Sequence, residues 1–199
     1  MEKIFLFDSI LRKKFNTKIL CGVDEVGRGC IAGPLVSSAV IFSDKISIPQ
    51  LKESKSVSPE KRKKLFIKIL SCAEKVSYSV ISTKTINKLG LNYANWLAMK
   101  SAVENIDFIF DIVVVDGYEI PNLNKQQIAI VGGDKKSAVV AAASIVAKVL
   151  RDRIMEFYDK IFNGYCFGKH KGYATEIHRT IVSEIGLSEL HRKYAYKFV

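Results

Sequence analysis

Short stretches in which apolar residues alternate with polar ones, or run without interruption, predict five β-strands in this chain. Residues 75–83 alternate Val76, Tyr78 and Val80 with serines, which is the period of a strand. Residues 112–115 are continuously apolar and β-branched, a pattern typical of a central strand that is covered on both faces. The predicted strands span residues 17–23, 34–43, 75–83, 112–115 and 127–131.

Helical patterns separate these strands. Residues 139–154 place apolar side chains at spacings of three and four, which predicts a long helix that starts near Ser137 and buries one face. Ser58 followed by Pro59 is typical of a helix start and predicts a helix to about residue 73. Further helical segments are predicted for residues 2–15, 92–105 and 175–184.

The order of these elements indicates an α/β fold. The first two strands are joined by a glycine-rich connection and are predicted to pair antiparallel, and the later strands alternate with helices. We therefore predict a five-stranded mixed sheet flanked by helices, with a small helical part at the C-terminus. In such a sheet, ligands gather at the carboxyl ends of the strands.

Composition and charge narrow the class of protein. The 199 residues are 48% hydrophobic and 26% charged, as expected of a globular chain with one sizeable core. The net charge of +11 favours a polyanionic partner, nucleic acid first and an anionic membrane surface second. The four cysteines form no CxxC pair, which predicts reduced thiols and a cytoplasmic protein. We recognise no signal peptide or membrane-spanning run and expect no membrane association.

Carboxylates stand where three of the predicted strands end. Asp24 stands at the end of the first strand with Glu25 directly after it, Asp116 ends the fourth and Asp134 follows the fifth, so the fold is expected to bring them together. Converging acids repel one another unless a cation compensates, and all-oxygen ligands suit Mg²⁺ or Mn²⁺. A basic protein with such a centre is interpreted as a nuclease or phosphoryl-transfer enzyme. Each acid taken alone would be interpreted as a loop cap.

A glycine-rich stretch follows the acid pair. Asp24 is expected to project from the strand, and Glu25 to reach the same site from the bend toward Gly27. Gly27 and Gly29 permit a close approach of the backbone to a ligand, and Arg28 between them can hold an anion.

Five sequence blocks resemble the ribonuclease HII family and occur in the order seen there. They are DEVGRG at residues 24–29, AGP at 32–34, VVDG at 114–117, GDKKS at 133–137 leading into AAASIVAKVLRD, and KHKGYAT at 169–175. The resemblance implies a ribonuclease H-like catalytic domain over residues 1–163 and a C-terminal helical extension over 164–199 that contributes substrate contacts. It also implies an endonuclease that cuts the RNA strand of RNA–DNA hybrids and incises 5′ of single ribonucleotides in duplex DNA.

The resemblance assigns the metal site. Asp24, Glu25, Asp116 and Asp134 match the family's four metal-binding acids, which implies hydrolysis with two Mg²⁺ or Mn²⁺ ions. The expected products carry 3′-hydroxyl and 5′-phosphate ends, with water and not the 2′-hydroxyl as the nucleophile.

The resemblance also assigns substrate contacts. Residues 27–29 match the loop that contacts the 2′-hydroxyl and phosphate of the ribonucleotide, and a 2′-hydroxyl is what distinguishes RNA from DNA. Tyr173 matches the tyrosine that packs on the sugar of the next nucleotide. Lys55 is assigned to a phosphate contact, although Glu53 stands where the family commonly has Asp.

Other polar residues receive simpler interpretations. Lys169 and His170 are expected to contact phosphate, whereas His178 and His191 are interpreted as structural. Asp152 is interpreted as a partner in a helix-surface ion pair and not as a fifth ligand.

Trp96 is expected in the core and residues 61–64 on a solvated helix face, with the substrate backbone as an alternative neighbour. Two alternatives to a ribonuclease stay open: a nucleic-acid-binding module without catalysis, and a junction-resolving or integrase-like nuclease that acts on DNA alone. We expect a monomer that acts on RNA–DNA hybrids and ribonucleotide-containing duplex DNA and that meets a replication or repair protein.

Overall fold

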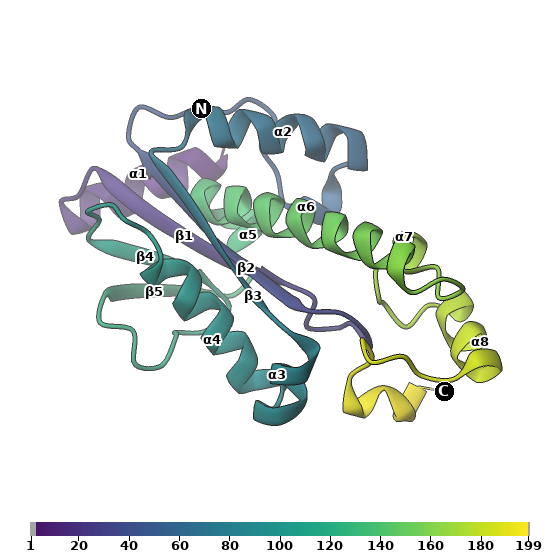
Figure 1. Ribbon diagram of the computed structural model, residues 1–199. Coiled ribbons are helices and arrows are strands. Elements are labelled where there is room, and N and C mark those ends of the chain that lie inside the picture. Colours follow the sequence, from purple (N-terminus) through teal and green to yellow (C-terminus); the bar gives the residue numbers. More distant parts are fainter. Residues whose placement is uncertain (1–2, 199) are drawn as a thin grey trace.

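The computed structural model describes residues 3–198. Residue 2 of the first predicted helix and residue 199 of the predicted C-terminal extension lie outside the described residues, as does residue 1. One sheet runs through the molecule in the spatial order β3-β2-β1-β4-β5 (Figure 1). β1 pairs antiparallel with β2 and parallel with β4, so the predicted mixed sheet is confirmed. The strands are β1 (Ile19–Val26), β2 (Leu35–Ser43), β3 (Lys75–Ile81), β4 (Ile112–Asp116) and β5 (Gln126–Ile130).

Helices cover both faces of the sheet, as predicted. Ser58 accepts a hydrogen bond from the Lys61 amide and Pro59 is the first residue of its helix, so the expected helix start is confirmed. A short helix at residues 83–89 was not predicted. The helices are α1 (Lys3–Phe15), η1 (Ser54–Ser56), α2 (Pro59–Cys72), α3 (Thr83–Leu89), α4 (Leu91–Glu104), α5 (Gly133–Lys136), α6 (Ala138–Ile161), α7 (Phe167–His170), α8 (Glu176–Ile185) and η2 (Lys193–Phe198).

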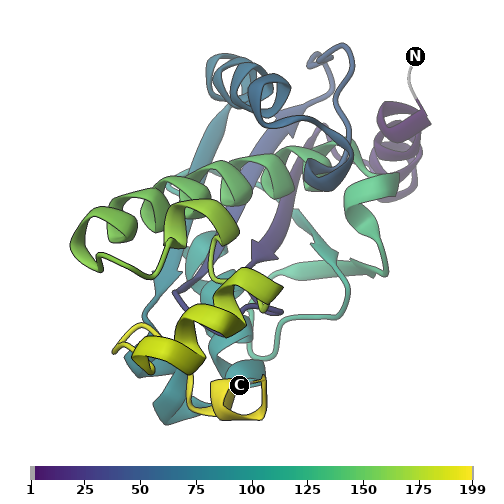
Figure 2. The ribbon, with the colours of Figure 1, turned by 90° about the vertical axis from the view of Figure 1, so that its right-hand side faces the viewer.

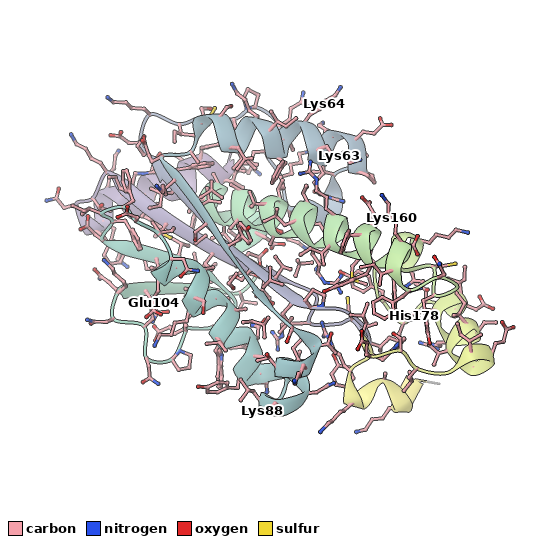
Figure 3. The ribbon with its side chains drawn as sticks, in the orientation of Figure 1. Lys63, Lys64, Lys88, Glu104, Lys160 and His178 are labelled. Carbon is pink, nitrogen blue, oxygen red and sulfur yellow. The ribbon has the colours of Figure 1, made fainter. Side chains whose placement is uncertain are left out.

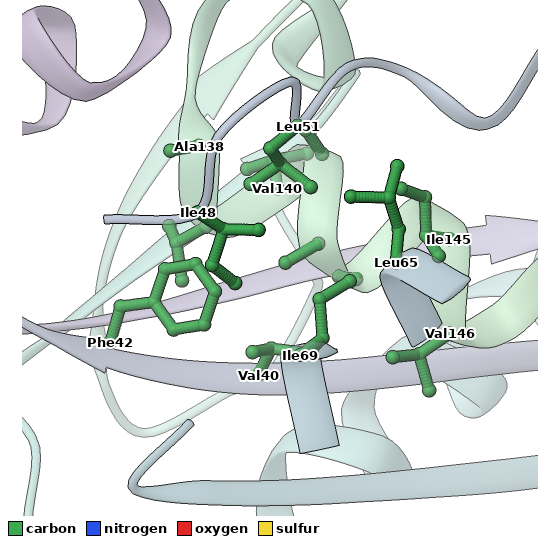
Figure 4. Close-up of a cluster of buried hydrophobic side chains, with 14 of the residues drawn as sticks. Val40, Phe42, Ile48, Leu51, Leu65, Ile69, Ala138, Val140, Ile145 and Val146 are labelled. Atoms are coloured by element: carbon green, nitrogen blue, oxygen red, sulfur yellow. The ribbon is translucent and has the colours of Figure 1, made fainter. Parts of the chain in front are cut away.

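Alternation along β1 divides the core into two layers. Leu20 packs with side chains of α2 and α6, in the cluster that also holds Val40 and Phe42 of β2 (Figure 4). Cys21 and Val23 face the opposite side and pack with α4. Successive side chains of a strand point to opposite faces, so neighbouring residues of β1 contact different helices.

The start of α6 lies directly against the sheet. Ser137 caps the helix, and its hydroxyl donates a hydrogen bond of 2.6 Å to the buried Asp8 of α1. The Val139 amide donates to the other oxygen of Asp8 at 3.0 Å. Gly22 of β1 faces this turn, where any Cβ would collide with the Val139 backbone. The close contact fixes α6 over the middle of β1.

The C-terminal elements gather at the far end of α6 (Figures 1 and 2). Isolated β-bridges join Cys30 to Tyr173 and Ala32 to His191. The segment after α6 therefore contacts the connection between β1 and β2, which carries the glycine-rich stretch.

All four cysteines are free thiols, as predicted. Within residues 3–198 we find no helix with the length and apolar character needed to cross a bilayer.

Candidate active site

β1 carries both adjacent acids, because it extends to Val26 and the bend begins only at Gly27. The prediction that the strand ends before Glu25 is therefore wrong. Asp24 shares its face of the sheet with Leu20 and lies beside Ser144 of α6, whereas Glu25 lies beside Asn95 of α4. The two carboxylates thus approach the strand end from opposite faces.

The four predicted acids nevertheless line one hollow of about 100 Å³, which we name the acid pocket. Its position at the carboxyl ends of β1 and β4 agrees with the rule for open α/β sheets. The pocket is lined by Asp24, Glu25, Val26, Ser54, Lys55, Asp116, Asp134, Ser144, Lys148 and Tyr173.

Asp116 and Asp134 reach the acid pocket from neighbouring elements. Asp116 is the last residue of β4, as predicted. Asp134 does not end a strand, because β5 stops at Ile130 and Asp134 lies in the short helix α5. Asp116 Oδ1 accepts a hydrogen bond of 2.6 Å from the Gly133 amide, which joins the end of β4 to the start of α5.

Three of these acids carry raised pKa values. Burial, followed by the Glu25 and Asp116 carboxylates, raises the pKa of Asp24 well above its usual range. Burial also raises the pKa of Glu25 against the opposing charge of Arg28. For Asp116, burial and the Asp134 carboxylate raise the pKa more than the Gly133 amide lowers it. The acids repel one another, and a cation bound among them would relieve that repulsion.

The donor chemistry fits divalent cations. Carboxylate oxygens are the ligands that Mg²⁺ and Mn²⁺ prefer in proteins. Within residues 3–198, no three His, Cys, Asp or Glu side chains already form a ligand set. Asp24 Oδ1 instead accepts a 2.6 Å hydrogen bond from the Glu25 amide. The shared pocket and the raised pKa values, and not a preformed coordination geometry, therefore support the metal site.

The glycine-rich loop lies beside the acids. Gly27 adopts a φ of +104°, a conformation that glycine tolerates best. Arg28 is half-exposed, with Nη1 4.0 Å from Glu25 Oε1. A Cβ on Gly29 would meet nothing within 4 Å, so this residue faces open space.

Tyr173 also lines the acid pocket, and its backbone pairs with Cys30, directly after this loop. Its ring lies 5.4 Å from Lys148 Nζ and 5.8 Å from the Arg151 guanidinium carbon. Burial raises the pKa of Tyr173 to about 12, so the phenol stays neutral at physiological pH. The ring therefore presents an uncharged surface beside the acids.

The segment that carries Lys55 also reaches the acid pocket. Lys55 is exposed and lowers the pKa of Asp116 by its charge. Glu53 Oε2 lies 3.7 Å from Lys135 Nζ, so this departure from the family pattern forms an ion pair with α5. The Ser54 carbonyl accepts a 2.9 Å hydrogen bond from Arg62 Nε of α2, which holds the segment in place.

Comparisons with known proteins agree with this geometry. The family model described as Ribonuclease HII matches residues 21–198. A ribonuclease HII of Caldicellulosiruptor saccharolyticus is 45% identical over 194 residues, which cover 96% of this chain and 93% of the relative. One of Borrelia hermsii is 41% identical over 183 residues, covering 91% and 100%. The chain belongs to the ribonuclease HII family.

Solved structures support the same fold. Ribonuclease H2 from Pyrococcus horikoshii OT3 superposes with a TM-score of 0.74 at 24% identity and covers 90% of this chain and 96% of its own. Ribonuclease HII of Archaeoglobus fulgidus, in its complex with PCNA, gives a TM-score of 0.75 at 25% identity over 88% and 94%. As a member of this family, the chain is a metal-dependent endoribonuclease that cleaves the RNA strand of RNA–DNA hybrids.

Two predictions made from the sequence are wrong. His170 was expected to contact phosphate, but it is buried, its Nδ1 accepts from the Gly172 amide and its Nε2 bonds the Tyr165 carbonyl. Trp96 was expected in the core, but it is 39% exposed. It lines a second cleft of about 280 Å³ that shares Glu25 and Asp116 with the acid pocket. Helical spacing alone could not tell this position from a buried one.

Other predictions are confirmed. Asp152 pairs with Lys148 at 2.7 Å and with Arg62 at 3.6 Å, so it belongs to an ion-pair network and not to the pocket. His178 and His191 are buried and bonded to each other, as structural residues should be. Lys63 and Lys64 of α2 project into solvent (Figure 3). The prediction that Lys169 contacts phosphate stays a prediction: Lys169 is exposed on α7 and does not line the acid pocket.

Sequence reasoning missed two polar residues of α6 that line the acid pocket, Ser144 and Lys148. They are four residues apart, so they share one face of the helix. The surrounding residues 138–147 are otherwise apolar. A polar pair on an apolar helix was the available signal.

Proposed function

We propose that this protein, besides cleaving hybrids, incises duplex DNA on the 5′ side of a single embedded ribonucleotide. The observation that carries the proposal is that the acid pocket, the loop of residues 27–29 and Tyr173 lie together. A single ribonucleotide offers one 2′-hydroxyl, so its recognition needs a reader next to the reacting phosphate. The products would be a 3′-hydroxyl and a 5′-phosphate.

Asp24, Glu25, Asp116 and Asp134 would hold two Mg²⁺ or Mn²⁺ ions. A homologous fold is known in complex with Mn²⁺, in the ribonuclease HIII named Bst-RNase HIII, at a TM-score of 0.65 and 19% identity. When bound, two such ions activate water for in-line attack on a phosphodiester and stabilise the leaving oxygen. The raised pKa values of Asp24, Glu25 and Asp116 support this assignment.

The remaining residues would orient the substrate strand. The backbone of residues 27–29 would contact the 2′-hydroxyl, and the half-exposed Arg28 the adjacent phosphate. The neutral ring of Tyr173 would pack on the sugar of the next nucleotide. Lys55 at the rim of the pocket would bind a phosphate, and the exposed Lys169 another farther along the backbone.

We further propose that the extension of residues 164–199 supplies substrate contacts to a catalytic part of residues 1–163, through Tyr173. The Archaeoglobus fulgidus relative was solved in a complex with PCNA, which supports a replication or repair protein as a partner here. A cytoplasmic monomer is the expected state, and the four free thiols are consistent with a reducing compartment.

A cleavage assay tests the proposal. The protein is incubated with Mg²⁺ or Mn²⁺ and three substrates: a duplex with one ribonucleotide, the same duplex without it, and a continuous hybrid. We expect incision only 5′ of the ribonucleotide in the first and throughout the RNA strand in the third. Asp116→Ala should abolish cleavage and leave binding, since loss of an acid does not weaken attraction to phosphate.

Two outcomes would contradict the proposal. An all-DNA duplex cut as fast as the ribonucleotide-bearing one would indicate a DNA nuclease without a 2′-hydroxyl reader. Cleavage of the hybrid with none at the single ribonucleotide would limit the enzyme to continuous RNA.

A further inference from the structure

Two arginines without a carboxylate partner lie behind the loop of residues 28–34. Arg151 of α6 and Arg192 near the C-terminus both have a relative exposure of 0%. Neither forms an ion pair with a carboxylate of residues 3–198. A buried charge of this kind is tolerated only when its donors are satisfied by well-placed acceptors.

Arg151 donates to three backbone carbonyls. Its Nε bonds Pro34 O at 2.9 Å and its Nη2 bonds Ala32 O at 3.1 Å. Its Nη1 bonds Lys171 O at 2.7 Å, two residues before Tyr173. One guanidinium therefore joins the loop of residues 28–34 to the segment that carries Tyr173.

Arg192 binds the same loop from the other side. Its Nε and Nη2 donate to Gly33 O at 3.1 and 3.0 Å, and its Nη1 donates to Arg28 O at 3.2 Å. The Tyr194 hydroxyl accepts from Arg192 Nη1 at 2.8 Å and donates to Cys30 O at 2.7 Å. The fixed fork of donors in arginine suits several carbonyls at once, which a lysine cannot reproduce.

Backbone bonds occupy most of the remaining groups of the loop. The Ile31 and Ala32 amides donate to Gly172 O, and the Gly33 amide donates to Leu190 O. Within residues 3–198, the Arg28 and Gly29 amides make no hydrogen bond. The loop is therefore held from behind, with the Arg28 carbonyl bound by Arg192, and the Arg28 and Gly29 amides are the donors left available to a substrate.

We propose that Arg151 and Arg192 are positioning residues that hold the Arg28–Gly29 backbone beside the acid pocket, and that incision at isolated ribonucleotides depends on them. The inference rests on the proposed function. A single ribonucleotide must present its 2′-hydroxyl in one register. A continuous hybrid offers a 2′-hydroxyl at every position, so a displaced loop can still find a productive arrangement.

The test is the ratio of two cleavage rates, single ribonucleotide over continuous hybrid, in Arg151→Lys and Arg192→Lys. We expect the ratio to fall by about tenfold, because small misplacements of a reading group are costly in rate. A merely structural role would lower both rates equally and leave the ratio unchanged.

Arg12→Lys is the matched control. Arg12 also binds three carbonyls, those of Lys18, Phe42 and Ser43, but at the opposite end of β1. Its ratio should equal that of the wild type. An equal fall in the control would overturn the inference.

Tyr194→Phe covers the case in which the arginine variants do not fold. It removes one hydroxyl from a half-exposed side chain. We expect the ratio to fall by about threefold, which corresponds to the loss of one hydrogen bond of modest strength. A ratio unchanged in Tyr194→Phe would overturn the inference while the proposed function stands. If the wild-type protein cuts the hybrid but does not incise at a single ribonucleotide, the proposed function and this inference are both overturned. The wild-type assay shows this before any variant is compared.

Discussion

At the scale of single residues, the acids that would bind metal also lower the stability of the metal-free protein. Asp116 is held against Asp134 and near Asp24, and burial and repulsion raise its pKa. An acid whose pKa is raised in the folded state contributes to the free energy of unfolding at low pH. That contribution is lost as the pH rises through the raised pKa. Above these raised pKa values, the ionised acids therefore weaken the metal-free fold.

Asp116→Asn should raise the melting temperature in EDTA by about 3 °C, the effect of roughly 1 kcal/mol for a chain of this size. It should also abolish cleavage, because a metal ligand is lost. Asp152→Asn is the control and should lower the melting temperature, because the Asp152 carboxylate pairs with the positive charges of Lys148 and Arg62. Differential scanning calorimetry in EDTA checks both; a lower melting temperature in Asp116→Asn would contradict the repulsion.

His191 and His178 form a hydrogen-bond chain that requires neutral rings, and His170 stacks on it. His191 Nδ1 accepts from the Ser188 amide, so its Nε2 donates to His178 Nε2 at 3.0 Å. His178 Nδ1 in turn donates to Tyr173 O at 2.8 Å. The rings of His170 and His178 stack at 3.8 Å. Protonation of His178 would place a second hydrogen between it and His191.

Burial lowers the pKa of His178 to about 4, and NMR titration of its ring protons should show this value. The unfolded chain takes up the proton near pH 6.5, so the contribution of His178 to the free energy of unfolding is lost as the pH falls from there toward 4. A ring that titrates near 6.5 in the folded protein would contradict the hydrogen-bond chain.

At the scale of elements, two glycines of β1 and its loop have different physical reasons. Gly22 lets α6 approach β1, since a Cβ there would strike the Val139 backbone. Gly29 faces open space, so no packing requires it. Gly22 is therefore required by the packing of the fold, whereas Gly29 is required by the proposed contact with ribose.

Gly22→Ala should unfold the protein or lower its stability by about 3 kcal/mol or more, because a backbone clash cannot relax by side-chain rotation. Gly29→Ala should fold normally but incise single ribonucleotides at least about tenfold more slowly, because its methyl group occupies the path of the substrate. Urea unfolding and the cleavage assay separate the two effects. Equal losses of stability would contradict the assignment.

At the scale of the whole molecule, an acidic centre is set in a basic protein. The net charge is +11, yet four carboxylates share one pocket. Electrostatic attraction to phosphate therefore comes from lysines and arginines around the site, whereas the acids act on the reacting bond only when cations are bound.

For the metal-free protein and a duplex, the logarithm of the binding constant should fall linearly with the logarithm of the salt concentration. Lys55→Ala should reduce the slope by about 1, the effect of one lost phosphate contact. Lys13→Ala removes the same charge from the exposed face of α1 and should leave the slope nearly unchanged. Fluorescence anisotropy at several salt concentrations measures both, and equal slopes for the two variants would contradict a contact by Lys55.

The sequence by itself determined the strands, the main helices and the candidate acids, because hydrophobic period, capping residues and motifs are local properties. It could not determine that β1 continues through Glu25, that Asp134 lies in a helix, or that Trp96 is half-exposed, since each depends on neighbours distant in the chain. Nor could it reveal Arg151 and Arg192, whose partners are backbone carbonyls that any residue supplies. Only the tertiary structure places those carbonyls around a guanidinium, because a hydrogen bond depends on position and not on side-chain identity.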